Sequence, residues 1–525
     1  MKETRHVTGE MHVFGNPFFS TIGVHAGYEE DTITGGSSCI VLSHGGRTRA
    51  AVTDNIIENR RIKYKPFYFR EKFLFYKAMK RVSFHTLGCK LNFAETSTFQ
   101  RQFSEQGFST VEFREESDVV LINTCSVTEN ADRDARKAVR QALRRSPDAY
   151  VIVVGCYAQL RPEELASIDG VDLVLGTEEK FHVFDHADPT WCKDQVRVVV
   201  GDVESVDGFG VAYSAEQSGR TRAFLKIQDG CDYTCSYCTI PMARGGSRSE
   251  SIERTLEHAR EILAQGFHEI VLSGVNVGDF GAGRDDSLND LLIELLALEG
   301  DFRIRISSIE PNLLSDDIIA LAKKNPQLVP HFHMPLQSGS DAVLRLMRRR
   351  YNTALFRDRI ETVMRALPEA AIGIDVIVGT PGETEEMFRQ AYQFLVDLPF
   401  TYLHVFSYSE RPGTDAVDIP DKVPPQERAR RSQMLRTLSQ RKRRAYYERQ
   451  LGRSLNVLFE TEENGQVTGF SENYVRVAVP WQVGLLNNTI PVRCTALGKG
   501  VVEGEVLEQP QVEDGFISLP IIQPE

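Results

Sequence analysis

The sequence has no long apolar run and no leader of the secretory type. No window approaches the roughly 18 uninterrupted apolar residues of a membrane-spanning helix, so we exclude such a helix. The first residues show no apolar stretch behind a basic one, which argues against a secretory signal. Nine cysteines in 525 residues are too few for a disulfide scaffold. We therefore expect a cytoplasmic protein with reduced thiols and no membrane partner.

Basic residues are also fewer than acidic ones. The sequence has 61 Lys and Arg and 73 Asp and Glu residues, which gives a net charge of −12. This balance argues weakly against a protein that binds nucleic acid. The hydrophobic fraction of 41% is ordinary and excludes wholesale disorder. At ~150 residues per domain, the length indicates about three or four domains.

Regular patterns begin only at Met79. Residues 1–78 show no sustained helical or strand period, and we interpret them as a poorly ordered extension. Translation from an upstream start that the cell does not use would explain it, and a functional arm is the alternative. The rest of the chain divides by composition and pattern into 79–200, a linker at 201–220, 221–449, 450–515 and a tail at 516–525.

Strand and helix signals alternate between residues 82 and 175, which predicts a doubly wound parallel α/β domain. Cys89, Cys125 and Cys156 each follow the end of a predicted strand. Because the carboxyl ends of parallel strands share one edge of the sheet, we expect these three thiols to converge. Their place in Gly-rich or polar turns favours a metal or cluster site over three ordinary buried thiols.

A second and tighter cysteine set follows a predicted strand at 223–228. Cys231, Cys235 and Cys238 have the spacing C-x3-C-x2-C. Thiolate-rich sites select iron–sulfur clusters or zinc, and three thiolates leave one iron of a four-iron cluster open. A structural zinc site would normally offer a fourth ligand nearby, and neither Cys nor His follows before His258. The spacing therefore favours an iron–sulfur cluster.

Six strand patterns alternate with six helical ones between residues 223 and 406, which predicts an incomplete, TIM-like (β/α)6 barrel. Chemistry in such a barrel lies at the carboxyl ends of the strands. Polar and Gly-rich segments follow four of these strands, at 273–276, 307–310, 337–340 and 379–383. Their side chains suit a ribose, an amino group or a carboxylate, although each segment alone is also ordinary turn chemistry.

Short alternating strands between residues 454 and 507 predict a small antiparallel β-barrel at the end of the chain. Nine basic residues against two acidic ones lie between Glu427 and Arg449, and further basic runs occur at 348–350 and in the helix after Cys125. Clustered basic side chains can bind phosphates even in an acidic protein. Solvated helix faces are the alternative.

The C-x3-C-x2-C loop together with 379–383 resembles the radical S-adenosylmethionine (SAM) signature and its Gly-rich SAM-binding strand end. With the upstream cysteine domain, residues 79–507 resemble the methylthiotransferases, and no motif cysteine is missing. Residues 84–92, FHTLGCKLN, and 307–310, SSIE, resemble the branch that acts on N6-threonylcarbamoyladenosine in tRNA. The terminal barrel resembles the RNA-binding TRAM domain.

The resemblance implies an enzyme that inserts a methylthio group at C2 of N6-threonylcarbamoyladenosine next to the anticodon. It implies two [4Fe-4S] clusters, one held by Cys231, Cys235 and Cys238 for radical cleavage of SAM, and an auxiliary one that supplies sulfur, held by Cys89, Cys125 and Cys156. The candidate SAM contacts are Tyr237, Asn276, Gln337, Ser338, Gly379 and Glu383.

The implied partners are the anticodon stem-loop of tRNA and an electron donor such as flavodoxin or ferredoxin, without a role for DNA. One alternative is a methylthiotransferase that acts on isopentenyladenosine in tRNA or on a ribosomal protein. Another is an RNA-binding iron–sulfur sensor without enzymatic activity. A sensor needs no SAM pocket, so the polar strand ends argue against it.

Overall fold

The computed structural model describes residues 80–206, 208–214 and 221–508, together with the backbone of four short strands before them. Contacts divide the chain into Met1–Lys77 and Ala78–Glu525. In the first unit, β1 (Ser37–His44) pairs with β2 (Arg47–Asp54), and β3 (Ile56–Glu58) pairs with β4 (Arg61–Lys63), both antiparallel. The sequence analysis expected no strands here. The rest of the predicted extension lies outside the described residues.

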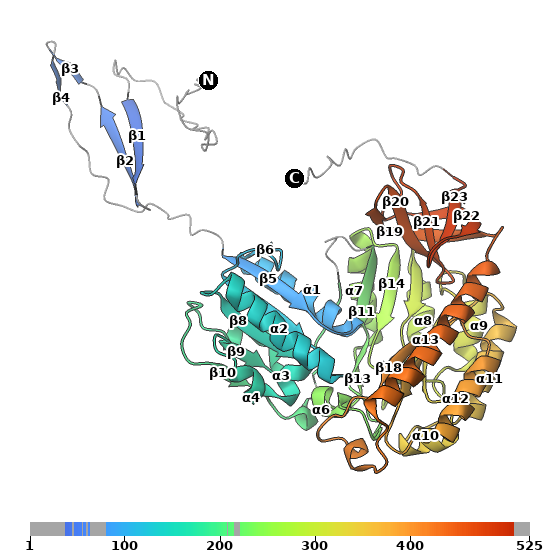
Figure 1. Cartoon of the computed structure of the whole chain (residues 1–525). Helices are drawn as coiled ribbons and strands as arrows, with labels where there is room; N and C mark the ends of the chain where they lie inside the picture. The colour runs from blue at the N-terminus through green and yellow to red at the C-terminus, as the bar shows by residue number, and fades with distance from the viewer. Residues whose placement is uncertain are drawn as a thin grey trace. The chain divides into compact units, whose positions relative to one another are not determined.

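The second unit begins with a six-stranded, wholly parallel sheet (Figure 1). Its strands are, in spatial order, β10 (Arg197–Val199), β9 (Leu173–Leu175), β8 (Tyr150–Gly155), β7 (Val119–Thr124), β5 (Arg81–Thr86) and β6 (Ser109–Val111). The helices of this domain are α1 (Lys90–Glu105), α2 (Glu129–Arg145), α3 (Cys156–Leu160), α4 (Pro162–Ala166) and α5 (Val183–His186). Phe99 and Phe103 of α1 cover one face of the sheet, and Ala135 and Val139 of α2 cover the other. The predicted doubly wound fold is confirmed.

The start of α1 differs from the sequence expectation. The spacing of Asn92 and Glu95 in the sequence is that of a capping box and predicts a helix start at Asn92, but the helix begins at Lys90 and Cys89 is its N-cap. Asn92 and Glu95 are buried, and their side chains bond to groups outside the first turn. Gly107 in the sequence predicts the end of this helix, and the helix does end just before it, with Gly107 at a φ of +80°, where glycine is favoured.

Six parallel strands form the central barrel. They are β11 (Arg222–Lys226), β14 (Glu269–Ser273), β15 (Arg303–Ile306), β16 (His331–Gln337), β17 (Ala371–Val378) and β18 (Tyr402–Ser407). The first three form one sheet and the last three another, and two isolated bridges, Ile304–Leu328 and Ser308–His333, connect the chain segments around β15 and β16. Outside lie α7 (Ile252–Ala264), α8 (Leu288–Leu296), α9 (Asp316–Lys324), α10 (Asp341–Leu346), α11 (Thr353–Ala366) and α12 (Glu385–Asp397). No ladder joins β18 to β11 among the described strands, so the predicted incomplete barrel is confirmed.

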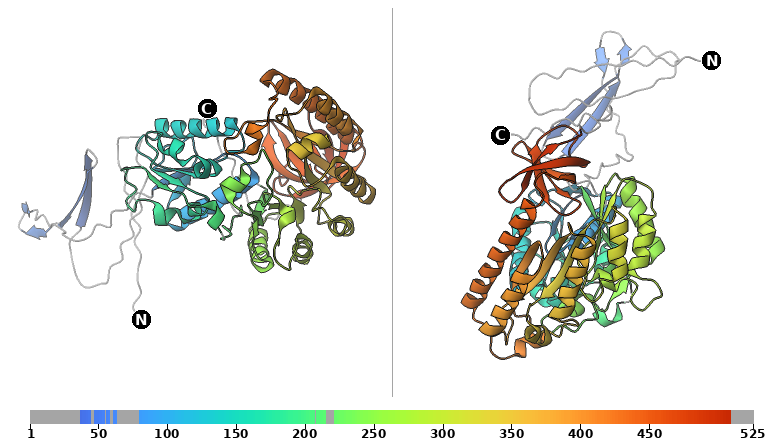
Figure 2. Two further views of the ribbon diagram at one scale, coloured as in Figure 1. Left: turned by 90° about the horizontal axis from the view of Figure 1, so that it is seen from below. Right: turned by 90° about the vertical axis from the view of Figure 1, so that its right-hand side faces the viewer.

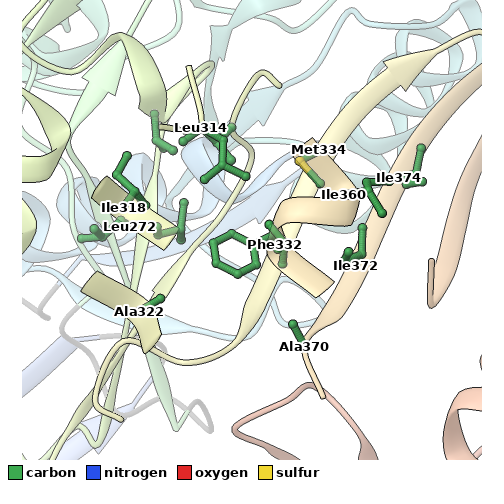
Figure 3. Packing of buried hydrophobic residues seen from close by; sticks show 14 of the residues in the cluster. Leu272, Leu314, Ile318, Ala322, Phe332, Met334, Ile360, Ala370, Ile372 and Ile374 are labelled. Carbon is green, nitrogen blue, oxygen red and sulfur yellow. The ribbon is translucent and has the colours of Figure 1, made fainter. Parts of the chain in front are cut away.

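The barrel strands alternate between an apolar outer face and a polar inner one, as the two-residue period of a strand requires. Ile372 and Ile374 of β17 belong to the core between strands and helices, together with Phe332 and Met334 of β16 (Figure 3). The intervening residues face the inside of the barrel. We call the inward side chains Arg305, His331, His333, Asp375, Tyr402 and His404 the barrel interior.

A closed five-stranded barrel ends the described chain, in the order β19 (Ser454–Glu463), β20 (Gln466–Ser471), β21 (Arg476–Pro480), β23 (Val502–Val506) and β22 (Thr489–Leu497). The pair β21–β23 is parallel, so the predicted antiparallel barrel is correct for the other pairs only. The 24-residue α13 (Pro425–Glu448) leads into this barrel (Figure 2). None of the helices in the described segments is long and apolar enough to cross a membrane.

Candidate active site

The C-x3-C-x2-C loop follows the short strand β12 (Gln228–Asp229), which pairs with β13 (Arg248–Ser249). Its three sulfur atoms accept hydrogen bonds from different donors. The backbone N–H of residue 233 donates to Cys231 Sγ, that of residue 240 donates to Cys238 Sγ, both at 3.4 Å, and Arg349 Nη1 donates to Cys235 Sγ at 3.2 Å. These donors suit thiolates.

Burial, with a smaller contribution from the neighbouring Cys235, raises the pKa of Cys231 to about 11 and that of Cys238 to about 12. Without a metal these thiols are therefore protonated near neutral pH. Metal ligands must be thiolates, so binding a metal would release their protons. Three soft sulfur donors, of which those of Cys235 and Cys238 have the cationic Arg349 as a neighbour, fit an iron–sulfur cluster.

The three cysteines open onto a cavity of about 290 Å³. Three of the predicted SAM contacts, Tyr237, Asn276 and Gln337, line it. Asn276 is fixed by its neighbours, because its backbone N–H donates to Gln228 Oε1 at 2.9 Å and its Nδ2 donates to Asp279 Oδ2 at 2.8 Å. The side chain thus presents its remaining groups in a defined orientation.

The other three predicted SAM contacts are not among the residues that line this cavity. Ser338 Oγ accepts a hydrogen bond from the backbone N–H of Ser340 at 3.3 Å. Glu383 Oε2 accepts from the backbone N–H of Gly379 at 2.6 Å and from Arg431 Nη1 at 2.8 Å. The carboxylate therefore ties the strand-end loop to α13, and the role of these residues towards SAM stays a prediction.

The structure brings Cys89, Cys125 and Cys156 together at the carboxyl edge of the parallel sheet. Cys125 follows β7, Cys156 begins α3 directly after β8, and Cys89 precedes α1. Burial, together with the adjacent Cys156 and Cys89, raises the pKa of Cys125 to about 12. A Cβ on Gly88 would lie only 2.6 Å from Cys125 Cβ, so the close approach of these two loops requires glycine.

The cavity also has a wall from the parallel-sheet domain, formed by residues close in sequence to one auxiliary cysteine. Val127 and Thr128, which follow Cys125 in the chain, line it together with Cys231. Ser409, which follows β18, completes this part of the wall, and its Oγ accepts from the backbone N–H of Glu129 at 3.1 Å. The cavity thus lies between the parallel-sheet domain and the central barrel.

A buried arginine ties the two cysteine loops to each other. Arg244, in α6 (Ile240–Arg244), is 1% exposed. Its Nη1 donates to Asp229 and Glu95, and its Nη2 donates to Asn92, all at 2.9 Å. Asp229 lies two residues before the C-x3-C-x2-C loop, and Asn92 lies three residues after the first auxiliary cysteine. Sequence reasoning missed Arg244, whose only signal is its place in a short helix close to that loop.

Glu95 stands at the centre of this network, because it also accepts from Lys180 Nζ at 2.8 Å. Burial disfavours the ionised carboxylate, but Arg244 and Lys180 outweigh this effect and lower the pKa of Glu95 to about 2. Breaking one partner of a buried ion pair is strongly destabilising, since the remaining charge stays buried. The relative position of the two domains therefore depends on this network.

Comparison with known proteins agrees with this geometry. Residues 81–176 match the family described as "Uncharacterized protein family UPF0004", and residues 225–395 match the radical SAM superfamily. The chain is 37% identical over 440 residues to a threonylcarbamoyladenosine tRNA methylthiotransferase of Bacillus subtilis (strain 168), covering 81% of this chain and 96% of that protein. The chain belongs to the radical SAM methylthiotransferase family.

Two further matches are a second relative of similar identity and a solved structure of much lower identity. A tRNA-2-methylthio-N(6)-dimethylallyladenosine synthase of Cereibacter sphaeroides (strain ATCC 17029 / ATH 2.4.9) is 32% identical, with 82% of this chain and 99% of that protein covered. A radical SAM methyltransferase structure from Kitasatospora setae, with cobalamin and a [4Fe-4S] cluster bound, gives a TM-score of 0.47 at 15% identity, covering 64% of this chain and 77% of that chain.

Family membership identifies a radical SAM methylthiotransferase, and enzymes of this family use SAM and [4Fe-4S] clusters. The alternative of a sensor without enzymatic activity is therefore set aside.

The barrel interior of this methylthiotransferase carries polar residues that the sequence analysis did not single out. His333 Nε2 lies 2.8 Å from Asp375 Oδ1, and ligand atoms of His333, Asp375 and His404 all lie within 4.8 Å of one another, a spacing that could hold a metal ion. The signal was present in the sequence, because His331 and His333 of β16, and Tyr402 and His404 of β18, alternate with apolar residues.

Many basic residues of the methylthiotransferase serve the fold and not a nucleic-acid surface. In α13, Arg428, Arg436 and Lys442 donate to backbone carbonyls of the barrel, and Arg431 pairs with Glu383. Other basic residues of α13, such as Arg441 and Arg443, are exposed. The helix is thus partly structural and partly a solvated basic face.

From the sequence, Phe470 and Tyr474 of the terminal barrel are candidates for stacking on RNA bases or for filling the barrel, but in the structure both rings pack against other residues of the protein. Phe470 and Tyr474 stack on each other at 4.6 Å between ring centroids. Arg222 lies over Phe470, and Arg305 and His331 lie against Tyr474. These rings therefore close the amino end of the central barrel. Trp481, in contrast, is 48% exposed after β21.

Proposed function

We propose that this enzyme inserts a methylthio group at C2 of N6-threonylcarbamoyladenosine next to the anticodon of tRNA. The observation that carries the proposal is a cavity lined on one wall by Cys231, Cys235 and Cys238 and on another by Val127 and Thr128, which lie two and three residues after Cys125. Radical formation and sulfur donation must act on one carbon atom, so their sites must face one space. The names of relatives, and residues 84–92 and 307–310, support this substrate.

The two cysteine sets fit two clusters. Cys231, Cys235 and Cys238 would hold one [4Fe-4S] cluster, and Cys89, Cys125 and Cys156 would hold the second. With SAM, these groups supply the radical and the sulfur that the reaction consumes. The chain itself positions them, binds SAM through groups such as Asn276 and Gln337, and excludes water with apolar walls.

Arg349 has a positioning role in this proposal. It is buried, donates to Cys235 Sγ and pairs with Glu310, which lines the same cavity. Burial raises the pKa of Glu310, and Arg349 opposes this effect. A guanidinium at a cysteine ligand stabilises the thiolate. The ion pair with Glu310 holds the guanidinium of Arg349 beside Cys235, so no solvent contact is needed to position it.

The tRNA substrate requires a basic surface outside the cavity. A groove of about 790 Å³ on the parallel-sheet domain is lined by Arg140 and Arg144 of α2, the helix that begins beside the cavity wall. These side chains can bind phosphates of the anticodon stem-loop while the exposed Trp481 of the terminal barrel stacks on a base. We propose a cytoplasmic location and an electron donor such as flavodoxin or ferredoxin.

The domain boundaries follow the same proposal. Residues 79–200 form the auxiliary-cluster domain, 201–220 the linker, 221–449 the radical SAM domain and 450–515 the TRAM-like domain, with residues 516–525 as a tail.

The decisive experiment is anaerobic reconstitution of the clusters, followed by incubation with reductant, SAM and tRNA that carries N6-threonylcarbamoyladenosine. Mass spectrometry of the nucleosides should detect the 2-methylthio derivative. Product only from tRNA with isopentenyladenosine, or only on a ribosomal protein, would refute the substrate. Failure to cleave SAM to 5′-deoxyadenosine would refute the radical mechanism.

A further inference from the structure

Three polar side chains of the barrel interior lie on neighbouring strands and form a cluster. Asp375 of β17 pairs in register with His404 of β18, and His333 lies on β16, the other neighbour of β17. The residues before and after each of the three, such as Ile374 and Val376, belong to the apolar core, so the three side chains share the inward face. The period of the strands thus places two imidazoles and a carboxylate side by side.

The cluster has the ligand types and the spacing of a metal site. His333 Nε2 lies 2.8 Å from Asp375 Oδ1, and one ligand atom from each of the three residues lies within 4.8 Å of the others. Ligand atoms that share one ion, at bond lengths of about 2.1 Å, lie about 3–4 Å apart. His404 is exposed, so rotation of its side chain can bring a ring nitrogen to such a distance. Two imidazoles and one carboxylate suit divalent transition metals.

The other charges of the barrel do not neutralise this cluster. Charged residues at the amino ends of the strands pair with partners of their own, Arg303 and Arg305 with Glu269, and Arg222 with Glu460. A further carboxylate, Glu472, interacts with two of these arginines. Lys90 acts on Asp375 electrostatically, but the only ion-pair partner of Asp375 in the described part of the chain is His333. The Asp375 carboxylate therefore keeps the capacity to bind a cation.

The cluster lies at the inner end of the cavity that the C-x3-C-x2-C loop borders. Ile377 and Asp375 of β17 line that cavity, whereas Gly373, the next inward residue towards the amino end, does not. The side chains of His333 and Asp375 are 17% and 20% exposed, so both are accessible from inside the barrel. A Cβ on Gly373 would lie 2.4 Å from Tyr402 Cζ, so the Tyr402 ring fills the barrel on the side of the cluster away from the cavity.

We propose that His333, Asp375 and His404 bind one divalent transition-metal ion at the inner end of the cavity. Three protein ligands leave coordination positions open, as in metal sites that bind water or a substrate. Because Asp375 lines the cavity, these positions lie on the cavity side and take water or an oxygen donor of a bound substrate. The ion is separate from the iron of the clusters, which sulfur ligands hold.

Titration with Mn²⁺ alone tests the proposal, because Mn²⁺ prefers oxygen and nitrogen ligands to thiolates. The full-length enzyme with reconstituted clusters is treated briefly with EDTA, desalted and titrated without oxygen, and free Mn²⁺ is followed by its electron paramagnetic resonance signal. The wild type should bind one ion per chain that His404→Ala and Asp375→Asn bind at least about tenfold more weakly. Changes that spare the ligands already weaken metal binding by about 10- to 100-fold.

The chain offers a matched control at His182, an exposed histidine whose Nδ1 lies 3.5 Å from Asp185 Oδ2. His182→Ala should bind Mn²⁺ like the wild type. Equal iron and sulfide contents exclude damage to the cysteine sites, and His404→Ala, which changes an exposed side chain, carries the test alone if Asp375→Asn loses its clusters. The bound Mn²⁺ should also enhance the relaxation of water protons, since its open positions hold exchanging water.

Two results would overturn the proposal. Equal Mn²⁺ affinity in the wild type, His404→Ala and Asp375→Asn would reduce the cluster to a hydrogen-bonded pair with a histidine beside it. A bound ion that gives no enhancement of water relaxation would exclude the open positions. Failure of the proposed function is separate, because it appears as absence of the 2-methylthio product, whereas Mn²⁺ binding is measured without SAM, reductant or RNA.

Discussion

The buried network around Glu95 should stabilise the contact between the parallel-sheet domain and the central barrel. Burial alone would raise the pKa of the Glu95 carboxyl group, but Arg244 and Lys180 outweigh this penalty and lower that pKa from 4.5 to about 2. Each pKa unit corresponds to about 1.4 kcal/mol, so the ionised carboxylate contributes roughly 3 kcal/mol, an order-of-magnitude value. We expect Glu95→Gln to lower the free energy of unfolding by about that amount, since it leaves two buried cations with less compensation.

The pH dependence has a defined sign. The contribution of a carboxylate with a lowered pKa is fully present above its ordinary pKa of 4.5 and is lost as the pH falls towards about 2. The wild type should therefore lose stability in this window, and Glu95→Gln should lose less. Glu105→Gln, an exposed change on the same helix, is the matched control and should behave like the wild type.

The chain offers a convenient probe for this measurement, because it has two tryptophans, Trp191 and Trp481. Trp191 packs edge-on against Phe108 and Tyr150 in the parallel-sheet domain. In a Trp481→Phe background, urea unfolding followed by fluorescence therefore reports on that domain. A Glu95→Gln protein with the same urea midpoint as Glu105→Gln at pH 7 would refute the reasoning.

Three further predictions concern the RNA surface and the cluster loop. Replacing Arg140 and Arg144 by Ala should weaken tRNA binding and reduce the slope of log affinity against log salt by about 1.5, measured by filter binding at several salt concentrations; an unchanged slope would contradict the phosphate contacts. Trp481→Ala should weaken binding of the anticodon stem-loop by about 5- to 100-fold in fluorescence anisotropy, as loss of one stacked base predicts, and equal affinity would exclude stacking there. Arg349→Met should slow SAM cleavage by about tenfold, since it removes a charge-assisted hydrogen bond to Cys235, with 5′-deoxyadenosine as the readout; an unchanged rate at full iron content would remove Arg349 from the site.

The features that local patterns encode were predicted well. The convergence of Cys89, Cys125 and Cys156 was predictable because each follows the end of a strand. Parallel strands bring their carboxyl ends to one edge of the sheet, so residues that directly follow those ends lie close together. The six barrel strands follow from a period of two residues between helical segments. Cys494 alternates with apolar residues and is buried, as expected from its strand.

Pairings between distant segments were not predictable in the same way. Glu95 was assigned to a capping box because Asn92 precedes it by three residues, yet its partner Arg244 is 149 residues away. Nothing in either local sequence encodes that pair. Phe470 and Tyr474 likewise looked free for RNA, because a strand pattern does not reveal which neighbouring domain covers it.

The central claim is that two cysteine sets with separate tasks serve one cavity. Matched variants, Cys89→Ala and Cys231→Ala, with iron content determined, test it most directly when 5′-deoxyadenosine and the 2-methylthio nucleoside are quantified in the same anaerobic reaction. We expect Cys231→Ala to lose both products. Cys89→Ala should keep SAM cleavage and lose the methylthio product. Equal loss of SAM cleavage in both variants would contradict the division of labour.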